Sequence, residues 1–489
     1  MSGRTEAAPA APATPGLSPE VWKAATVVIL GATMSFLDST VVNVALKALA
    51  AGLVTSLDTI QWVVTAYLLA VAAAIPASGW AARRFGAQRS YLFAVLLFTA
   101  ASALCGVAQS AGQLIAFRVL QGLGGGMIMP IGQIILARAA GPRNLARVMS
   151  VVGVPIVLAP VFGPFAGGLL LHYANWRWIF FVNLPVGLLA ALCALRLLRP
   201  DRPQQAAPLD PVGLAAISAS MVALTYGLGG VGRHTSAGAL LALLGGGLLL
   251  VLFVLRTLRT AHPLFDLRLY RDPVFRAASL TTLFLSMGMY AGMVLMPLYF
   301  QSVRHADPVT TGALLLPASA GAAAATWLSG RAVERLGGGR TAFLGAALSL
   351  AAAVPFVLLR VDTPYPVIGS AMLVSGFGAG LSVMPAMTSA FRALDPAQLG
   401  DASPQLNMLQ RLGGSVATAV FVAVLQNGLD GAGDSTGRQL AAYTDTFWWS
   451  LGAAALAAGA ALLLARAQQR SEPPRSAPTH RGTPQKAEA

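Results

Sequence analysis

The chain has 489 residues, of which 56% are hydrophobic and only 10% are charged. Because charged residues make up about 25% of an ordinary soluble domain, this composition excludes a typical soluble protein. The formal net charge of +15 would favour nucleic acid as a partner of a soluble protein, but here the charges lie between long apolar runs, so we expect no nucleic-acid partner.

Long apolar runs recur along most of the chain, and each is long enough to cross a bilayer as a helix. A soluble α/β enzyme would interrupt its apolar runs after about 8 residues. The sequence therefore predicts an all-α integral membrane protein. In chain order, its fourteen expected transmembrane helices cover approximately residues 24–46, 59–79, 90–108, 113–136, 147–171, 179–198, 211–230, 238–258, 275–300, 311–330, 341–360, 366–390, 404–426 and 446–466.

The expected helices divide the chain into five parts. Residues 1–22 and 467–489 are rich in Pro, Ala and polar residues, and we expect them to be disordered cytoplasmic tails. The first of them lacks the basic and then apolar order of a signal peptide. Between the tails we expect a six-helix bundle over 23–200, two inserted helices over 201–272 and a second six-helix bundle over 273–466.

The distribution of basic residues sets the expected orientation. With both tails inside and Arg411 counted on the inner side, 26 of the 33 Lys and Arg residues are inner and 6 are outer, and Arg118 alone falls within a helix. This asymmetry follows the positive-inside rule. Arginine greatly outnumbers lysine and alanine is abundant, which suggests a GC-rich bacterial genome. We therefore expect a multi-pass protein of the bacterial cytoplasmic (inner) membrane with both termini cytoplasmic.

Two sequence patterns occur twice, once in each six-helix bundle. The segment GWAARRFGAQR at 79–89 is followed 251 residues later by GRAVERLGGGR at 330–340. The segment QGLGGGMIMP at 121–130 is followed 254 residues later by SGFGAGLSVMP at 375–385. The bundles are therefore expected to be parallel copies of each other. Repeated halves with a binding site between them are the usual plan of secondary transporters.

An aspartate interrupts the first apolar run, in the segment FLDSTVVNVALKAL at 36–49. Asp38 lies about 21 Å along the first helix from its inner end, which leaves about 9 Å to the outer face of a core of about 30 Å. Arg118 lies near the outer end of the fourth helix, again about 9 Å deep. Two opposite charges at equal depth predict an ion pair, or a competition between Arg118 and a substrate for Asp38.

A carboxylate inside hydrocarbon costs about 3 kcal/mol, so we expect Asp38 to carry a proton, face water or meet a cation. Burial favours its neutral form and a neighbouring guanidinium favours its ionised form, a balance that suits a group that exchanges protons. Structural alternatives exist for each residue. Asp38 could fix the first helix by a hydrogen bond, and Arg118 could bind backbone carbonyls of that helix. Gln121, one turn further on, could contact substrate or join helices.

We expect Cys105 near the outer end of the third helix and Cys193 near the inner end of the sixth. A disulfide requires Cα atoms within about 7 Å, so these residues are too far apart in depth to pair. We interpret both as packing residues.

Four motifs resemble those of the fourteen-helix drug:proton antiporters of the major facilitator superfamily, and the resemblance extends over residues 22–466. LDSTVVNVAL at 37–46 resembles the first-helix signature L-D-x-T-V-x-N-V-A-L-P, with Lys47 in place of the proline. The second motif, LIAFRVLQGLGGG at 114–126, fits the pattern L-x3-R-x2-Q-G-x-G. The third, GPFAGG at 163–168, fits the core of the antiporter signature in helix 5. The fourth, WRWIFFVNLPVG at 176–187, is typical of the subgroup at the start of helix 6. The resemblance implies the major facilitator fold, with two six-helix pseudo-repeats plus two inserted helices.

The resemblance also implies residues that control conformational change. After the second helix the superfamily has G-x-L-A-D-R-x-G-R-R, and Arg83 stands at the acidic position, whereas Glu334 keeps an acid at the matching position of the second copy. We therefore expect the usual charge latch on the inner face to be altered in the first copy only. An ordinary excess of positive charge on the inner face is the alternative. The candidate gating residues are Gly79, Arg83, Arg84, Gly86, Arg89, Gly163, Pro164, Gly167, Gly168, Glu334, Arg335 and Arg340.

The expected substrate pocket combines the intramembrane charges with residues of other helices. The ninth helix contains a cluster of Met and Tyr, which suits a promiscuous apolar surface, although packing or contact with lipid is the alternative. No acid lies in the last six helices, which favours neutral or singly charged substrates. The candidate proton-coupling residues are Asp38 and Arg118, and the candidate substrate-binding residues are Met34, Asp38, Asn43, Tyr67, Arg118, Gln121, Tyr290 and Asn407.

The resemblance implies a proton-coupled secondary active efflux transporter, an antiporter that exports amphipathic drugs, antibiotics or a secondary metabolite by alternating access. A proton-coupled symporter that imports a small nutrient is the alternative, and the helix 5 signature speaks against it. We do not expect an enzyme, because the chain has no GxxxxGK[ST] phosphate loop, no HExxH motif and no Cys/His cluster. We expect no cofactor and no metal. The expected partners are protons, a small amphipathic substrate and the lipid bilayer, and the expected functional unit is a monomer.

Overall fold

The computed structural model describes residues 17–200, 208–231, 237–430 and 435–471. These residues form helices without a β-strand, as the sequence predicted. In chain order the helices are α1 (Pro19–Gly52), α2 (Leu57–Phe85), α3 (Ala87–Val107), α4 (Ala111–Tyr173), α5 (Trp178–Phe181), α6 (Asn183–Leu197), α7 (Pro211–Val231), α8 (Ala237–Arg259), the 3₁₀ helix η1 (Leu267–Arg271), α9 (Pro273–Ser302), α10 (Pro308–Leu336), α11 (Gly338–Val357), α12 (Tyr365–Arg392), α13 (Leu399–Asp430) and α14 (Thr436–Ser471).

The first and last helices are longer than the apolar runs that predicted them. Residues 19–22 and 467–471, which the sequence assigned to disordered tails, are helical. α1 begins early because the Ser18 side chain accepts a hydrogen bond from a backbone N–H of the first helical turn. The last turns of α14 are held because Gln468 accepts a hydrogen bond from the backbone N–H of Gly339 at 2.6 Å. Most of both expected tails lies outside the described residues.

Helix α4 contains two of the expected transmembrane helices. Its 63 residues are continuous except at Gly141, which has φ 62° and ψ 175° and breaks the helix into two arms. Glycine tolerates this positive φ because it has no Cβ. Within the described residues, thirteen helical stretches are long and apolar enough to cross a membrane. Counting the two arms of α4 as two crossings gives the fourteen that the sequence predicted.

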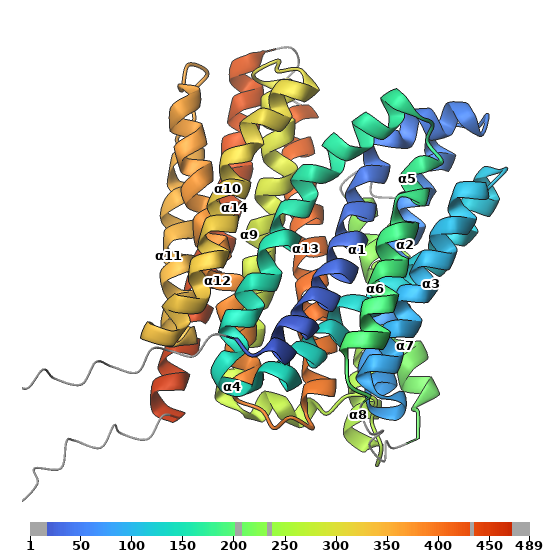
Figure 1. The fold of residues 1–489 in the computed structure, drawn as a ribbon. Helices are drawn as coiled ribbons and strands as arrows, with labels where there is room; N and C mark the ends of the chain where they lie inside the picture. The colour runs from blue at the N-terminus through green and yellow to red at the C-terminus, as the bar shows by residue number, and fades with distance from the viewer. Residues whose placement is uncertain (1–16, 201–207, 232–236, 431–434, 472–489) are drawn as a thin grey trace, which may run out of the picture.

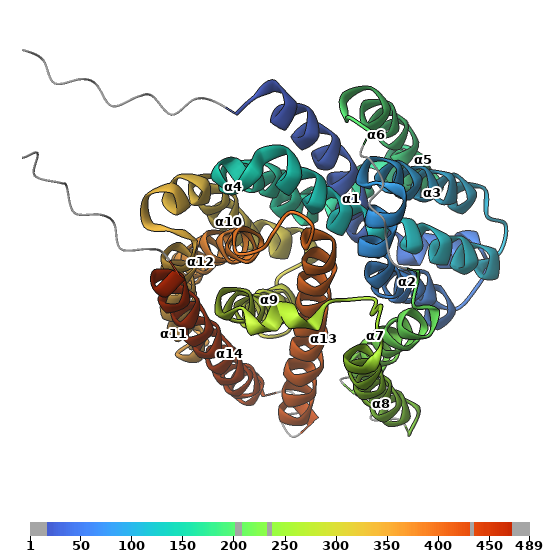
Figure 2. The ribbon, with the colours of Figure 1, turned by 90° about the horizontal axis from the view of Figure 1, so that it is seen from below.

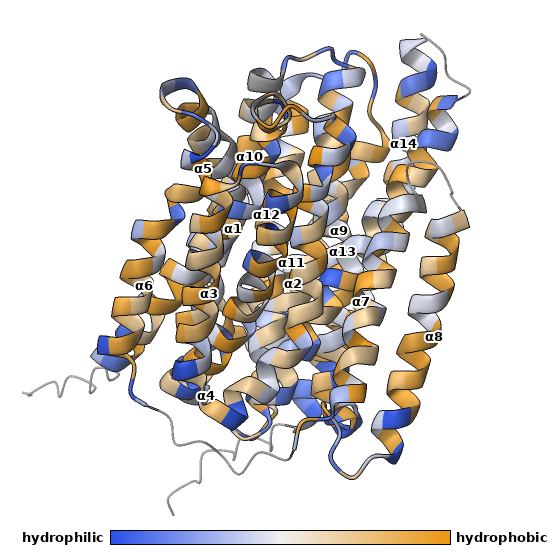
Figure 3. Cartoon of the chain, turned by 90° about the vertical axis from the view of Figure 1, so that its right-hand side faces the viewer, coloured by the Kyte–Doolittle hydropathy of each residue, from blue (hydrophilic) through white to orange (hydrophobic). Residues whose placement is uncertain are grey.

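The outer surface of the bundle matches a lipid environment. Figure 3 shows apolar residues along most of the length of the helices, whereas hydrophilic residues gather near their ends. Large apolar side chains on α8 are strongly exposed, among them Leu241, Leu244 and Leu248. A continuous apolar surface of this kind is unfavourable in water and is expected where a helix faces lipid tails. The fold is that of an all-α integral membrane protein.

The helices form two six-helix bundles, with α7 and α8 beside them. In Figures 1 and 2, α1–α6 lie on one side of the molecule and α9–α14 on the other. The bundles meet where α2 packs against α13, and where α4 packs against α10, α12 and α13. Helix α7 packs against both α2 and α13, so the inserted pair flanks this interface. We call the face on which α1 begins and α14 ends the terminal face; it is the lower face in Figure 1.

Close contacts of glycine residues show that the two bundles are copies. A Cβ on Gly122 would lie 2.5 Å from the carbonyl oxygen of Tyr67, and a Cβ on Gly376 would lie 1.9 Å from that of Ala318. Gly122 and Gly376 are 254 residues apart, and the two carbonyls are 251 residues apart, as in the two repeated motifs. The same geometry recurs one turn later in the pairs Gly126–Val71 and Gly380–Ala322.

The repeated loop motif also has the same backbone conformation in both copies. Gly86 follows α2 with φ 89° and ψ 147°, and Gly337 follows α10 with φ 84° and ψ 156°. L side chains rarely adopt such a positive φ, so both copies of the motif require glycine here. The candidate gating residue Gly86 therefore forms the sharp turn from α2 into α3.

Candidate proton and substrate site

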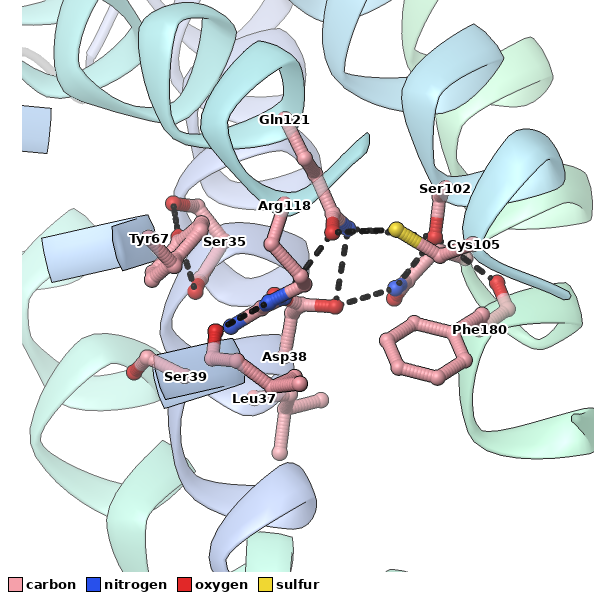
Figure 4. A network of polar contacts seen from close by, with 12 residues as sticks. Ser35, Leu37, Asp38, Ser39, Tyr67, Ser102, Cys105, Arg118, Gln121 and Phe180 are labelled. Carbon is pink, nitrogen blue, oxygen red and sulfur yellow. Dashed lines mark hydrogen bonds and ion pairs between the residues drawn. The ribbon is translucent and has the colours of Figure 1, made fainter. Parts of the chain in front are cut away.

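Asp38 and Arg118 are in contact in the interior of the N-terminal bundle. Arg118 donates from Nη1 to Asp38 Oδ2 at 2.5 Å, and neither residue is more than 1% exposed. Asp38 comes from α1 and Arg118 from the early turns of α4, as their equal depth predicted. Gln121, one turn further along α4, donates to Asp38 Oδ1 at 2.9 Å and accepts from Arg118 at 2.8 Å. Figure 4 shows the three side chains converging.

Three further residues complete this network, and the sequence analysis assigned none of them to it. Asn183, the first residue of α6, donates to Asp38 Oδ1 at 2.8 Å and to Ser102 Oγ at 3.0 Å. Ser102, on α3, also accepts from Gln121 at 3.1 Å and donates to a backbone carbonyl at 2.9 Å. The Cys105 thiol donates to Gln121 at 3.6 Å, so our interpretation of this cysteine as a packing residue was incomplete.

The groups that contact the Asp38 side chain share one property, which is that they can donate hydrogen bonds. Its carboxylate accepts from one guanidinium and from two side-chain amide NH₂ groups, and all three groups act here as donors. Such donors stabilise the ionised form of a carboxyl group. Protonation would turn one carboxyl oxygen into a donor and would remove the negative charge that holds Arg118.

Helix α2 supplies the rest of the environment of Arg118. The guanidinium lies over the ring of Tyr67, 3.9 Å from the ring centroid, and Nε donates to the carbonyl oxygen of Val63 at 3.1 Å. The carbonyl that Arg118 binds therefore belongs to α2 and not to the first helix, which was the alternative in the sequence analysis. The Tyr67 hydroxyl lies 3.4 Å from Ser35 Oγ on α1. These contacts join α1, α2 and α4 around the ion pair.

The glycines of the helix 5 motif position the second arm of α4 beside this network. Gly163 and Gly167 pack against α1 within one turn of Asp38, and a Cβ on Gly163 would lie 2.0 Å from the hydroxyl oxygen of Thr40. Small residues allow this close approach of two transmembrane helices. The two other candidates in this motif are Gly168, which faces open space, and Pro164, whose side chain lies outside the described part of the chain.

Other candidate substrate residues do not join the network. Met34 is buried in the core of the N-terminal bundle, one turn before Asp38. Asn43 is exposed, and its amide donates to a backbone carbonyl of its own helix. Tyr290 packs against Gly414 within the C-terminal bundle, where a Cβ on the glycine would lie 2.6 Å from the ring. Residue type and membrane depth suggested these three, but neither determines which face of a helix a residue occupies.

Arg411 changes the account of intramembrane charge. From the sequence we counted Arg411 on the inner side and took Arg118 as the one basic residue within a helix, which was wrong. α13 begins at Leu399, so Arg411 lies three turns inside it, and its side chain is partly buried. A second arginine therefore lies within the membrane-spanning region, on the helix that packs against α2.

The loop motif after α2 contacts the C-terminal bundle at the terminal face. Arg83 Nη1 donates to Asp401 Oδ1 at 2.7 Å. One turn earlier, Gly79 lies against the start of α13, where a Cβ would be 1.9 Å from the carbonyl oxygen of Gly400. The first copy is altered, as expected, but it still forms an ion pair across the interface. Arg83 supplies the positive charge, and the acid comes from the opposite bundle.

The second copy of the motif makes a different contact. Glu334 is exposed and forms no ion pair with another described residue. Gly330, the equivalent of Gly79, lies against α4, and the hydroxyl groups of Ser150 and Ser329 are 2.8 Å apart beside it. The motif itself therefore makes a neutral hydrogen bond on this side. Beside it, Arg392 of α12 donates to the backbone carbonyl oxygens of Pro142 and Arg143 at 2.7 and 3.3 Å. The remaining charged candidates are exposed near the terminal face: Arg84, Arg89, Arg335 and Arg340.

A buried polar cluster joins the bundles deeper in the interface. Gln133 Oε1 on α4 accepts from Ser403 Oγ and from Asn407 Nδ2 on α13, each at 2.8 Å. All three residues are no more than 7% exposed. Asn407, a candidate substrate residue, is therefore occupied in a joint between the two bundles. Gln133 was not identified from the sequence, because its partners come from the other half of the chain.

Comparisons with known proteins agree with this architecture. Residues 28–418 match the model of the Major Facilitator Superfamily. The chain is 37% identical over 409 residues to the multidrug resistance protein B homolog of Mycobacterium tuberculosis, covering 82% of this chain and 76% of that protein. It is 31% identical over 448 residues to the putative multidrug resistance protein MdtD of Cronobacter sakazakii, covering 90% and 93%.

Solved structures show the same fold at low sequence identity. The human organic anion transporter MFSD10 (TETRAN) has a TM-score of 0.61 and 16% identity, covering 89% of this chain and all of that chain. The proton:xylose symporter XylE has a TM-score of 0.60 and 14% identity, covering 89% and 95%. Identities this low support the fold and not the substrate.

Proposed function

The chain belongs to the major facilitator superfamily, and from that premise we propose that it is a proton-coupled antiporter that exports small amphipathic compounds. It is a multi-pass membrane transporter and not an enzyme. The observation that carries the proposal is the buried ion pair between Asp38 and Arg118, since intramembrane ionisable residues are usually functional. The multidrug-resistance names of the bacterial relatives support drugs or metabolites as the exported class.

In this proposal Asp38 exchanges its partner during transport. In the arrangement seen here Arg118 neutralises the carboxylate. Removing one partner of a buried pair costs about 3–5 kcal/mol, so Arg118 leaves Asp38 only when a proton or a cationic group of the substrate replaces it. Proton binding and substrate binding at Asp38 then exclude each other. A membrane potential supplies about 2.3 kcal/mol per charge for every 100 mV.

The contacts between the bundles support alternating access. The inter-bundle contacts Arg83–Asp401 and Ser150–Ser329 lie toward the terminal face, and the cluster around Gln133 lies deeper. We place the terminal face, with both termini, in the cytoplasm of a bacterium, because the predicted inner segments carry most of the basic residues. The structure then corresponds to a state closed toward the cytoplasm, and Arg83 acts as a latch that must release before the inner side opens.

The proposed substrate path runs between α2 and α13. Tyr67 lies on α2 and Arg411 on α13, two helices that pack against each other, and Tyr67 also touches Arg118. A substrate that displaces Arg118 from Asp38 would therefore contact residues of both bundles. One chain contains both bundles, so we propose that a monomer transports without a cofactor, driven by the proton gradient.

Transport in inverted bacterial vesicles tests the proposal. The native protein is expressed in a pump-deficient bacterium, and uptake of ethidium is followed with an imposed proton gradient. We expect the native vesicles to accumulate dye until the gradient is collapsed, and Asp38→Asn vesicles to accumulate none. Asp58→Asn is the matched control, because Asp58 is an exposed aspartate on the first turn of α2.

Two outcomes would contradict the proposal. Equal transport by native and Asp38→Asn vesicles would make Asp38 a structural residue. Dye movement driven by the gradient in the opposite direction would indicate a symporter. Protein level and insertion are measured for each variant, so that loss of transport is not confused with loss of protein.

A further inference from the structure

A groove at the terminal face opens between the two bundles, far from the Asp38 network. Its volume is about 280 Å³. Trp22, at one edge of it, lies sixteen residues before Asp38, which is about 24 Å along α1. Figure 2, viewed from the terminal face, shows the start of α1 beside α4 at the rim of the molecule, and α10 packs against α4. The groove is lined by Leu17, Trp22, Arg147, Ser150, Val151, Trp327, Gly330 and Arg331.

The lining of this groove is apolar except for two arginines and one serine. Arg331 lies over the ring of Trp327, 4.3 Å from its centroid. Neither Arg147 nor Arg331 forms an ion pair with another residue of the described chain. Glu334, one turn after Arg331 on α10, is not part of the lining. The groove therefore presents two positive charges that have no carboxylate partner within it.

The position of these side chains matches the level of lipid head groups. Trp22 lies in the first turn of α1, Arg147 follows the break in α4, and Trp327 and Arg331 lie in the last turns of α10. The two Trp side chains are 47% and 55% exposed. Trp and Arg at helix ends are typical of the membrane interface, where a ring meets acyl chains and a charge meets phosphate.

We propose that this groove binds an anionic phospholipid of the leaflet at the terminal face. The phosphodiester lies between Arg147 and Arg331, and the start of an acyl chain lies along Trp22 and Val151. Basic pockets between transmembrane helices bind anionic head groups, and the guanidinium fork matches phosphate oxygens. The mixture of two charges and an apolar wall fits a molecule that has both a phosphate and a long chain. A free phosphate would use only the arginines.

Such a lipid would join the two bundles. Arg147 belongs to the N-terminal bundle and Arg331 to the C-terminal bundle, and the Ser150–Ser329 hydrogen bond lies beside them. A lipid bound to both arginines therefore stabilises the arrangement that is closed at the terminal face. This inference concerns lipid binding and holds whatever compound the protein transports.

Thermal unfolding of the purified full chain in neutral detergent tests the proposal. Phosphatidylglycerol, phosphatidylcholine and inorganic phosphate are added separately to native protein and to three double variants. Arg147→Gln/Arg331→Gln removes both charges, and Arg147→Lys/Arg331→Lys keeps them. Arg268→Gln/Arg276→Gln removes two exposed arginines of η1 and α9 outside the groove. Native mass spectrometry counts the phosphatidylglycerol molecules that remain bound.

We expect phosphatidylglycerol to raise the Tm of the native protein, of the Lys variant and of the control variant, and to raise that of the Gln variant little. One bound lipid should be lost from the Gln variant alone. An equal shift in native and Gln variant would overturn the proposal. So would an equal shift with phosphatidylcholine, or a full shift with inorganic phosphate, which would show a free-anion site. If the double Gln variant does not fold, the single variant at the exposed Arg331, Arg331→Gln, must show a smaller shift than native protein.

Discussion

The two bundles share one scaffold, but the space that holds a polar network in the N-terminal bundle contains a cavity in the C-terminal bundle. In the N-terminal bundle, the space between α1, α3, α4 and α6 holds the polar network around Asp38. In the C-terminal bundle, the space between α9, α11, α12 and α14 holds a cavity of about 70 Å³. The repeat offsets place Ser375 at the position of Gln121 and Ala353 at that of Ser102, and both line this cavity.

The same offset places a buried Met372 at the position of Arg118. Arg118, one member of the buried ion pair, thus has an apolar counterpart in the C-terminal bundle. The glycine contacts that bring the helices together are nearly identical in both copies, so packing does not require the charges. The comparison shows that the shared packing is compatible with a charged network in one bundle and with an uncharged cavity in the other, which agrees with the proposed role of Asp38 and Arg118 in proton coupling.

The largest effect is expected from breaking the ion pair. Arg118→Gln leaves a buried carboxylate without its counter-charge, which should cost about 3–5 kcal/mol of stability. Little folded protein is expected at neutral pH by size-exclusion chromatography and thermal unfolding. The equivalent change in the other copy, Met372→Leu, conserves volume and should cost less than about 1.5 kcal/mol.

A second variant shows whether the charge itself is responsible. Asp38→Asn/Arg118→Gln removes both charges and should recover much of the folded protein without recovering transport. If the double variant is as unstable as Arg118→Gln alone, the loss comes from the packing of Arg118 and not from its charge.

An intermediate effect is expected from the equivalent pair Gln121 and Ser375. Gln121→Ala removes a donor to Asp38 and an acceptor for Arg118, and an unsatisfied buried group costs about 1–3 kcal/mol. Thermal unfolding should show this loss, and proton-driven dye transport should fall. Ser375→Ala should leave both measurements nearly unchanged, because its side chain lines a small cavity and takes part in no ion pair. Similar losses in the two variants would remove the functional difference between the bundles.

Glycine substitutions test the shared scaffold. Gly122→Ala and Gly376→Ala place a Cβ within 2.5 Å of a backbone oxygen, so both should lose about 1–3 kcal/mol through overpacking. Gly288 lines the C-terminal cavity and a Cβ there meets open space, so Gly288→Ala should gain about 0.5–1 kcal/mol. Chemical unfolding of the three variants measures whether each substitution lowers or raises the free energy of unfolding. A loss in only one of the first two would show that the copies do not share their packing.

The smallest effect is expected at the latch of the first motif copy. Arg83 and Asp401 are each 17% exposed, so water screens their pair more than it screens the fully buried pair of Asp38 and Arg118, and we expect the latch to contribute less to stability than that pair. A double-mutant cycle with Arg83→Ala and Asp401→Ala measures this coupling. The double variant Arg83→Asp/Asp401→Arg exchanges the two charges, and it should restore the transport that is lost in Arg83→Asp alone or in Asp401→Arg alone. Failure of the exchanged pair would mean that the latch depends on side-chain shape as well as charge.

Much of the site could be predicted because depth follows directly from sequence. Counting residues from the helix ends placed Asp38 and Arg118 at the same level, and the structure places them in contact. The spacing of three residues on α4 placed Gln121 on the same face as Arg118. Asn183 carried a weaker signal, since it is a polar residue in the motif at the start of the sixth expected helix.

The remaining contacts depend on packing between distant helices, which depth and residue type do not determine. Asp401 and Gln133 meet their partners only because α13 crosses beside α2 and α4. The rotation of each helix about its own axis leaves Asn43 exposed on the surface and packs Tyr290 against a glycine, although the sequence predicted both residues in the substrate pocket. Arg411 was misassigned because we grouped it with the basic residues of the inner side, whereas it lies within the membrane-spanning helix α13.

The most direct test of the central claim is proton release on substrate binding. Purified protein in weakly buffered detergent is mixed with ethidium over a series of pH values, and a pH-sensitive dye records the protons released. The account predicts that native protein releases protons over part of this range, and that Asp38→Asn protein binds ethidium without releasing them. Equal proton release by the Asp38→Asn protein would place the exchange at another group and would contradict the account.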